Sequence, residues 1–443
     1  MSDPVSSLIA RHFAVTDGEL RVGRVPVSAL AERYGTPVYV YDAGVLDRKW
    51  RLLREALTGE FTIAYSVKAN PNPALIEHFL GKPCDLEIAS AGEFHAALQA
   101  GCPPSRILFA GPGKTDPELE LVLKEGIGEI HAESLGEIQR IGAIADRLAV
   151  QAPVAIRVNP GATAQGGAMR MGGKPAPFGI DEEALDPALD ALLSTPSIEF
   201  HGVHLFAGTQ ILDHTVLAAQ YRKGFEIAER IAGRAGKPLR TVDFGGGLGI
   251  PYFEGERELD MEGLGREVRS LMAEARAQFA FSGTRFVVEP GRYLVGEAGI
   301  YVARVIDVKV SRGKRFLIVD GGMNHHLAAS GNLGQVIKRN FPIGIVNGLD
   351  RPSIGPVDVV GPLCTPLDTL ARDVRLPEAR PGDLIGIFQS GAYGRSASPL
   401  SFLSHPTPPE VLVSDGTDRL IRRRGTHQDS FRDLPDSADG GRP

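Results

Sequence analysis

Three short segments place charged side chains or glycines where apolar, strand-like runs end. In the first, residues 65–70, Lys68 closes an apolar run. A lysine at such a position loses hydration, which favours the neutral amine that attacks an aldehyde. The alternative is a lysine whose side chain reaches back to solvent from the same run. Lys68 is therefore a candidate for Schiff-base chemistry.

A glycine run and an acid–base pair close two later apolar runs. Residues 245–249 read Gly-Gly-Gly-Leu-Gly, and residues 289–292 read Glu-Pro-Gly-Arg. Consecutive glycines let backbone N–H groups surround a phosphate, although a plain loop is the commoner meaning of such a run. Glu289 and Arg292 could form an ion pair. In a cofactor site, Arg292 would bind phosphate and Glu289 would hold a proton on a pyridine nitrogen.

The elements that must position these segments alternate between strand-like and helix-like patterns. The predicted strands lie at 61–68, 84–88, 107–110, 129–132, 155–158, 200–206, 242–244 and 285–288. The predicted helices lie at 73–80, 92–100, 117–124, 135–148, 186–193, 215–233 and 261–279. About eight βα units favour an α/β fold with a (β/α)8 TIM-like barrel, and an open doubly wound sheet is the alternative. Barrel enzymes hold catalytic groups at the carboxyl ends of their strands, and phosphate sites favour the loops after the seventh and eighth strands.

The pattern of predicted elements changes after residue 289, where strand-like runs follow one another without long helices. These runs lie at 301–310, 316–320, 357–360, 384–388, 411–414 and 420–422, and an N-terminal strand at 37–41 is expected to join them. The pattern predicts a C-terminal all-β domain, a β-sandwich or Greek-key barrel. The predicted division is an N-terminal segment 1–44 that contributes strands to the β domain, a barrel 45–293, a β domain 294–425 and a disordered tail 426–443.

Composition excludes several classes of protein. The chain of 443 residues is 43% hydrophobic and 23% charged, with a formal net charge of -6, so it has no basic footprint for nucleic acid or anionic membranes. No transmembrane run or signal-like apolar start is visible, and a cytoplasmic protein is expected. The three cysteines are too few and too widely spaced for a disulfide framework or zinc site, so no metal is predicted.

Seven motifs in a fixed order resemble the fold-type III decarboxylases that depend on pyridoxal 5′-phosphate (PLP). This family includes ornithine, arginine and diaminopimelate decarboxylases, and the resemblance runs from about residue 35 to about residue 425. The motifs are the Lys68 segment and residues 87–93, 208–210, 245–247, 289–292, 361–364 and 391–394.

The resemblance implies a role for individual residues. Lys68 would hold PLP as a Schiff base, and Glu289 would pair with its pyridine nitrogen. Cys364 would come from the partner subunit of a homodimer with shared active sites and return a proton after CO2 leaves. Thr365 and Asp368 lie in the same loop and are expected near the substrate. The expected cofactor-binding residues are Lys68, Glu87, Ser90, Phe206, Thr209, Gly246, Gly247, Glu289, Arg292 and Tyr393.

The sequence departs from the family pattern in two places. Phe206 stands where the family usually has a histidine against the cofactor ring, and His204 lies two residues earlier on the same face of a strand. Phe206 can stack on a ring but cannot donate a hydrogen bond. Thr365 follows the loop cysteine where ornithine and diaminopimelate decarboxylases have an acid that holds a distal ammonium. The Arg-Pro and Leu-Tyr segment of the diaminopimelate enzymes is also missing after residues 320–323.

A closer resemblance is to two subgroups of the family. They are the decarboxylases of exosortase and exopolysaccharide systems, and the butirosin-pathway enzyme that decarboxylates glutamate attached to an acyl carrier protein. The similar segments are 171–173, 206–210, 364–366, 396–399 and 421–426. We therefore expect an amino-acid decarboxylase whose substrate has an uncharged or carrier-linked distal end. Arg170 and Lys174 would then meet an acidic carrier; the alternative, which is the commoner case, is a solvated basic loop. The alternatives are a meso-diaminopimelate decarboxylase that makes L-lysine, a racemase of the same fold and an inactive decarboxylase-like binding protein.

Overall fold

The computed structural model describes residues 4–57, 59–161, 175–205, 208–335 and 337–434, and only the backbone of residues 169 and 170. The chain forms two compact units. The barrel unit comprises Asp47–Pro251 and Glu256–Val295. The β unit comprises the chain up to Leu46, the short segment Tyr252–Gly255 and the chain from Gly296 onward.

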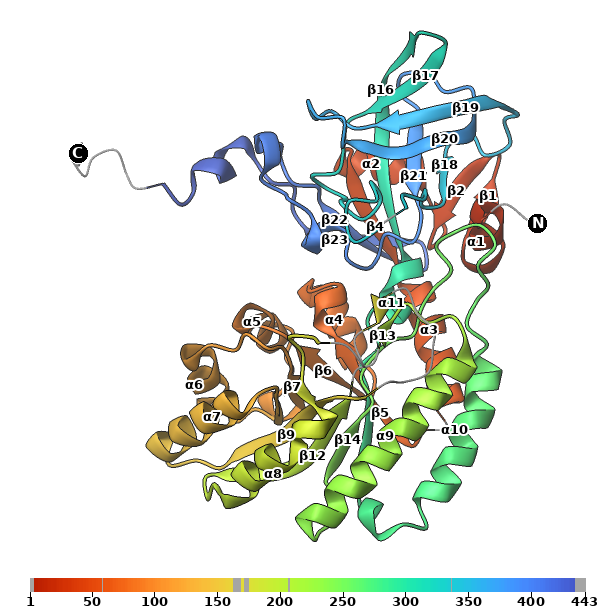
Figure 1. Cartoon of the computed structure of the whole chain (residues 1–443). Helices are drawn as coiled ribbons and strands as arrows, with labels where there is room; N and C mark the ends of the chain where they lie inside the picture. The colour runs from red at the N-terminus through yellow and green to blue at the C-terminus, as the bar shows by residue number, and fades with distance from the viewer. Residues whose placement is uncertain are drawn as a thin grey trace, which may run out of the picture. The chain divides into compact units, whose positions relative to one another are not determined.

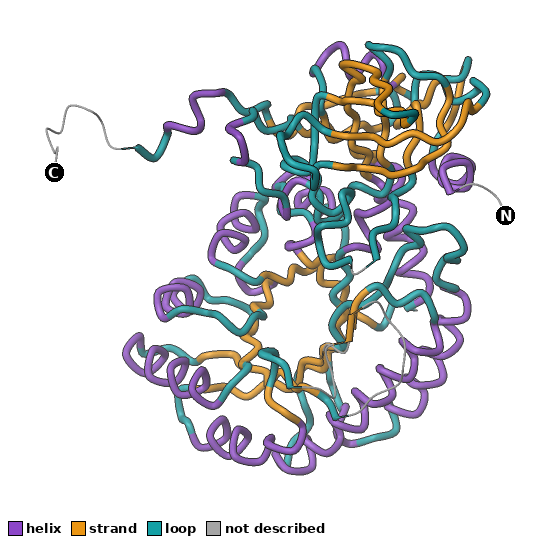
Figure 2. The backbone as a smooth tube through the Cα atoms, turned by 45° about the horizontal axis from the view of Figure 1, so that its top comes forward, coloured by secondary structure: helices purple, strands orange, loops and turns teal. Residues whose placement is uncertain are grey.

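Eight parallel strands form the wall of the barrel unit (Figure 2). They are β5 (Phe61–Ser66), β6 (Cys84–Ile88), β7 (Ile107–Phe109), β8 (Glu129–Ala132), β9 (Ala152–Asn159), β12 (Ile198–Leu205), β14 (Thr241–Asp243) and β15 (Arg285–Val288). The last strand, β15, pairs with the first, β5, and β8 pairs with β9, so the sheet closes on itself. This closure confirms the predicted barrel and rules out the open doubly wound sheet.

Helices surround the barrel strands, and all but the first of them follow a barrel strand (Figures 1 and 2). They are α3 (Ala43–Ala56), α4 (Pro73–Leu80), α5 (Ala91–Gln99), α6 (Asp116–Lys124), α7 (Leu135–Leu148), α8 (Leu185–Ser194), α9 (His214–Ala235), α10 (Met261–Ala275) and the short α11 (Arg292–Val295). Local sequence sets several starts: Thr115 and Glu118 form a reciprocal capping box at α6, and the Ser134 side chain accepts the Glu137 N–H at α7.

The β unit is organised around the long strand β16 (Gly299–Ser311), which pairs with β17 (Lys314–Val319), β4 (Val38–Asp42) and β21 (Leu384–Ile387). The sheet continues through β19 (Ser353–Val360) and β20 (Thr369–Pro377) on one side, and through β22 (Glu410–Ser414) and β23 (Thr417–Arg422) on the other. β18 (Ile343–Ile345) pairs with β21. The predicted N-terminal strand therefore lies inside this sheet, between β16 and β22.

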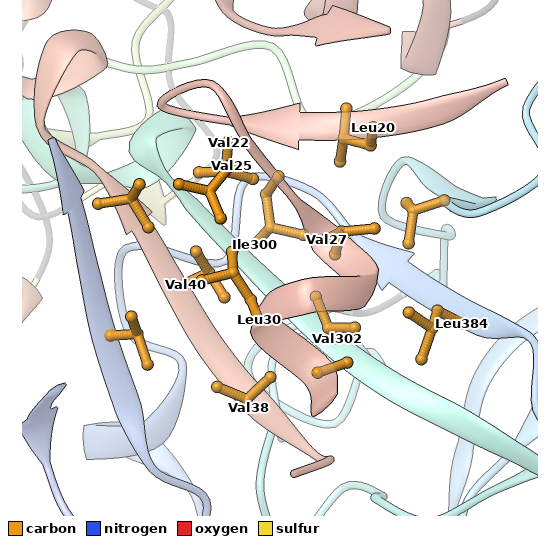
Figure 3. Packing of buried hydrophobic residues seen from close by; sticks show 14 of the residues in the cluster. Leu20, Val22, Val25, Val27, Leu30, Val38, Val40, Ile300, Val302 and Leu384 are labelled. Carbon is orange, nitrogen blue, oxygen red and sulfur yellow. The ribbon is translucent and has the colours of Figure 1, made fainter. Parts of the chain in front are cut away.

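The N-terminal residues also supply α1 (Pro4–His12), α2 (Val27–Tyr34) and a small sheet of β1 (Ala14–Thr16), β2 (Glu19–Val22) and β3 (Val25–Pro26). Their apolar side chains pack against β4 and β16, as Figure 3 shows for Leu30, Val40 and Ile300. Because α1 and α2 are short, their apolar periodicity spans about two turns and gives little signal.

Several details of the structure were not predicted from the sequence. β18 and β20 were not among the predicted strands, and Tyr252–Gly255 groups with the β unit. In the predicted tail, residues His427–Phe431 form a 3-10 helix whose start is capped by Thr426. Residues 435–443 lie outside the described part of the chain. No helix in the described residues is long and apolar enough to cross a membrane.

Gly202 on β12 marks a close approach between barrel strands. A Cβ atom there would lie 1.9 Å from the Thr241 carbonyl oxygen on β14. We therefore expect Gly202→Ala to lower the free energy of unfolding by about 1–3 kcal/mol, because both strands are paired on each side and cannot move apart freely. Gly136→Ala in α7 is the control, since a Cβ there would meet no heavy atom within 4 Å. Urea unfolding of both variants measures the effect, and equal stabilities would contradict this packing.

Candidate active site

Lys68 and Glu87 meet at the carboxyl end of the barrel strands. The Lys68 Nζ donates to both carboxylate oxygens of Glu87, at 2.8 Å each, and the Ser66 hydroxyl donates to Glu87 Oε2 at 2.5 Å. Glu87 is fully buried on β6, whereas the Lys68 side chain is 44% exposed. Lys68 does not close the strand as predicted: it lies in the 3-10 turn η1 (Val67–Ala69) that follows β5. The turn brings its amine toward solvent, and the buried carboxylate fixes its position.

Glu289 lies immediately after β15 beside two histidines and a second acid. Its side chain is 4% exposed; Oε2 is 3.3 Å from His204 Nε2, and Oε1 is 3.9 Å from His131 Nδ1. Burial, followed by the charge of Glu289, raises the pKa of Asp243 well above its usual value. Burial lowers the pKa of His204 well below its usual value, and the charge of His131 adds to this effect. The arrangement therefore favours a neutral His204 and a proton near Asp243.

The glycine run after β14 forms a close-packed turn at the same end of the barrel. Gly247 has a φ of +106°, and a Cβ there would lie 3.2 Å from the Gly208 carbonyl oxygen. The Ile211 N–H donates to the Gly247 carbonyl at 2.9 Å, which joins this turn to the loop that contains Thr209. Backbone without side chains can approach a phosphate closely.

The segment that carries Arg292 packs against the Lys68 turn. The Ser66 N–H donates to the Pro290 carbonyl at 3.2 Å, and a Cβ at Gly291 would lie 2.9 Å from the Ala69 Cβ. The barrel therefore brings the Lys68 turn, Glu87, the glycine run, Glu289 and Arg292 to one end, as parallel strands require of residues at their carboxyl ends.

Two predicted cofactor residues are less easily placed. The Ser90 hydroxyl accepts the Glu93 N–H at 3.2 Å and so caps α5. Burial raises the pKa of Glu93 to about 7. Phe206 lies outside the described residues, as do residues 171–174 and the side chain of Arg170. Their predicted roles stay predictions.

The remaining predicted site residues belong to the β unit. Cys364 is an exposed free thiol in the loop 361–368. Asp368 in the same loop is buried, and its two carboxylate oxygens accept the N–H groups of Met323 at 2.6 Å and Leu363 at 2.9 Å. Tyr393 is half-buried and has a φ of 52°, a left-handed conformation that bulky residues rarely adopt. The Asp368 carboxylate therefore shapes the loop that presents Cys364.

Several buried ionisable residues inside the barrel, at the site or leading away from it, were not predicted from the sequence. They are Glu129, His131, Glu133, Arg157 and Asp243. The Arg157 guanidinium donates to Glu133 at 2.6 Å, next to the histidine cluster. The sequence does contain a signal for these residues. Charged or histidine side chains inside short apolar strands are unusual unless they are paired.

These groups fit one cofactor. The Lys68 amine can bind an aldehyde, and Glu289 Oε1 is a buried acceptor that no described residue satisfies by a hydrogen bond. A protonated pyridine nitrogen supplies the missing donor, and the glycine turn with Arg292 can receive a phosphate. Pyridoxal 5′-phosphate has all three features, so the fold and site define a PLP-dependent barrel enzyme.

Comparison with known proteins identifies the family. Residues 43–296 match the family described as the pyridoxal binding domain of pyridoxal-dependent decarboxylases. The chain is 40% identical over 413 residues to an L-glutamyl-[BtrI acyl-carrier protein] decarboxylase of Niallia circulans, covering 93% of this chain and 96% of that protein. It is 33% identical over 428 residues to a diaminopimelate decarboxylase of Zymomonas mobilis, covering 95% and 98%.

Solved structures with a similar fold come from the same family of enzymes. A crystal structure of diaminopimelate decarboxylase from M. jannaschi has a TM-score of 0.88 and 27% sequence identity, covering 96% of this chain and 98% of that one. The chain belongs to the pyridoxal-dependent decarboxylases. It is a PLP-dependent carboxy-lyase, which confirms the predicted enzyme class and cofactor.

Proposed function

We propose that this enzyme decarboxylates an amino acid whose side chain ends in a neutral group, such as a thioester to a carrier protein. The main support for this substrate class is the loop that contains Cys364. Thr365 follows the cysteine, and Asp368, the only acid in residues 361–369, uses its carboxylate to bind two backbone N–H groups. A distal ammonium buried at this loop would lack a counter-charge there, which costs several kcal/mol. The 40% identical relative is named as acting on a glutamyl carrier protein, which is consistent with this substrate class.

The chemistry assigns a task to each group. When bound and protonated at its ring nitrogen, PLP would supply an electron sink for the substrate Cα during loss of CO2. Lys68 holds the cofactor covalently between turnovers, and Glu87 orients the lysine amine. Glu289 holds the proton on the ring nitrogen. The family resemblance implies that the cofactor phosphate would be held by Thr209, Gly246, Gly247, Arg292 and Tyr393.

We further propose that Cys364 acts from the partner subunit of a homodimer. Its thiol donates a proton to the substrate Cα after CO2 has left, and an exposed thiol can regain that proton from solvent. The family resemblance supports this assignment, and the loop cysteine lies far along the chain from Lys68. A cytoplasmic location stays a prediction.

One other substrate stays open to the same test. A diaminopimelate decarboxylase that makes L-lysine is favoured by the names of relatives at 32% to 34% identity. The missing acid after Cys364 argues against it. A cofactor-free binding protein is disfavoured because the Lys68–Glu87 pair and the open acceptor of Glu289 are intact.

The substrate is tested with a panel scored for CO2 release. It contains meso-diaminopimelate, L-ornithine, L-lysine, L-glutamate and glutamate joined through its side-chain carboxyl to a carrier protein or to N-acetylcysteamine. The link must use that carboxyl, because decarboxylation needs a free α-carboxylate. We expect kcat/KM for the carrier-linked substrate to exceed that for diaminopimelate by at least about 100-fold, or about 2.7 kcal/mol. Efficient conversion of free diaminopimelate to lysine would contradict the proposal.

A pair of matched variants tests whether position 365 faces the distal end of the substrate. Thr365→Glu supplies an acid after the cysteine and is expected to raise kcat/KM for L-ornithine and diaminopimelate relative to the carrier-linked substrate. Leu367→Glu places the same charge on an exposed residue two positions further on and is the control. Equal responses from the two variants would show that position 365 does not face the distal end of the substrate.

A further inference from the structure

A line of buried ionisable groups leads away from Glu289 through the inside of the barrel. The rings of His131 and His204 are stacked with centroids 4.2 Å apart and an interplanar angle of 26°. His204 contacts Glu289 at 3.3 Å, and both histidine side chains are at most 1% exposed. Two stacked imidazoles without solvent cannot both carry a positive charge at low cost.

The surroundings of the two rings differ, and they show which one is charged. His131 Nε2 is 3.1 Å from Glu129 Oε1 and 3.9 Å from Asp243 Oδ2, while its Nδ1 is 3.9 Å from Glu289 Oε1. His131 Nε2 is therefore hydrogen-bonded to Glu129, while Nδ1 faces Glu289 beyond hydrogen-bond distance. Three carboxylates lie within 4 Å of this buried ring, and opposite charges so close favour its charged form. Burial and the neighbouring charges lower the pKa of His204, which favours its neutral form. The surrounding carboxylates therefore favour a positive charge on the His131 ring rather than on the His204 ring.

Glu129 extends the line to the opposite end of the barrel. It is the first residue of β8, and its Oε2 is 3.0 Å from His201 Nδ1. Burial opposes the charge of Glu129, but the hydrogen bonds and charges of His131 and His201 outweigh it and lower the pKa of Glu129. The His201 side chain is 13% exposed and continues to Glu199 at 3.3 Å. Solvent therefore reaches this line at the amino ends of the strands.

We propose that His131, anchored by Glu129, is a positioning residue that keeps Glu289 anionic and thereby sets the affinity of the site for a pyridine ring protonated at nitrogen. With the cation present, the proton that these two adjacent buried carboxylates, Glu289 and Asp243, share stays near Asp243. Without it, Glu289 would compete for that proton and lose the acceptor that the ring N–H needs. The inference rests on the proposed pairing of Glu289 with the ring nitrogen.

The test compares two ligands that differ at one atom. PLP has a ring nitrogen, and 1-deaza-PLP has a C–H group in its place, so only PLP can donate to Glu289. Dissociation constants of both are measured on apoprotein by equilibrium dialysis for the wild type, His131→Asn and Glu129→Gln. Glu289→Gln is the reference variant. His78→Asn is the control, because His78 pairs with Asp47 on the outside of the barrel unit at 2.9 Å.

We expect His131→Asn and Glu129→Gln to weaken PLP binding about tenfold, the scale of a charged hydrogen bond, and to change 1-deaza-PLP binding less than about twofold. His78→Asn should change neither. Equal weakening of both ligands would show a merely structural role and overturn the inference. Glu129→Gln decides the matter if His131→Asn does not fold.

The reference variant separates two kinds of failure. If Glu289→Gln does not discriminate between the ligands, the proposed Glu289 pairing is wrong, and the inference falls with it. If Glu289→Gln discriminates but His131→Asn and Glu129→Gln do not, only the role of His131 is wrong. An equimolar metal ion in the purified protein would also overturn the inference, because His131, His204, Asp243 and Glu289 are close enough to ligate one.

Discussion

Replacing Lys68 with alanine is expected to abolish decarboxylation while leaving the chain folded. The variant has no amine at the site to hold the cofactor, so kcat should fall below about one-thousandth of the wild-type value, more than about 4 kcal/mol of transition-state stabilisation. The fold should survive because Lys68 is 44% exposed and because Glu87 keeps its hydrogen bond from Ser66. Activity and thermal unfolding are measured on the same preparation.

A covalent readout makes this prediction specific. Borohydride reduction followed by denaturing gel filtration should leave PLP attached to the wild type and not to Lys68→Ala. The control is Lys124→Ala, which removes a surface lysine paired with Glu120 on α6 and should keep the label. Retention of reducible, covalently bound PLP in Lys68→Ala would show that another lysine holds the cofactor.

Cys364→Ala should lower kcat by about 10²- to 10⁴-fold, the usual effect of losing a positioned proton donor. If Cys364 serves the partner subunit, two inactive variants should restore one another. Equal amounts of Lys68→Ala and Cys364→Ala that exchange subunits at random give half mixed dimers, each with one complete site. The expected activity is about a quarter of the wild-type value. The measurement is CO2 release after exchange has been shown with differently labelled subunits.

The outcome of this mixing experiment distinguishes two arrangements of the site. No recovery despite proven exchange would mean that Cys364 serves its own subunit or takes no part. Cys102→Ala is the control, because Cys102 is buried beside the backbone of Pro103, and burial raises the pKa of its thiol to about 12. It should keep near-normal activity with or without mixing.

Much of the fold was predictable because its signals are local. β6, β8 and β15 and the helices α4 and α7 begin and end where the apolar periodicity predicts. The order of motifs was sufficient to identify the family, the cofactor and the enzyme class. The strands β18 and β20 were missed because they lie among turn residues and pair with partners that a one-dimensional pattern does not reveal.

The sequence by itself determined which chemical groups this protein has, since residue type and order along the chain carry that information. Only the tertiary structure decided what surrounds them. Lys68 meets a carboxylate 19 residues away, and Glu289 lies beside residues of β8, β12 and β14. These neighbours come together because eight strands close into a ring, which points side chains from distant segments into one interior. Burial, charge state and the line from Glu289 to His201 all depend on that closure.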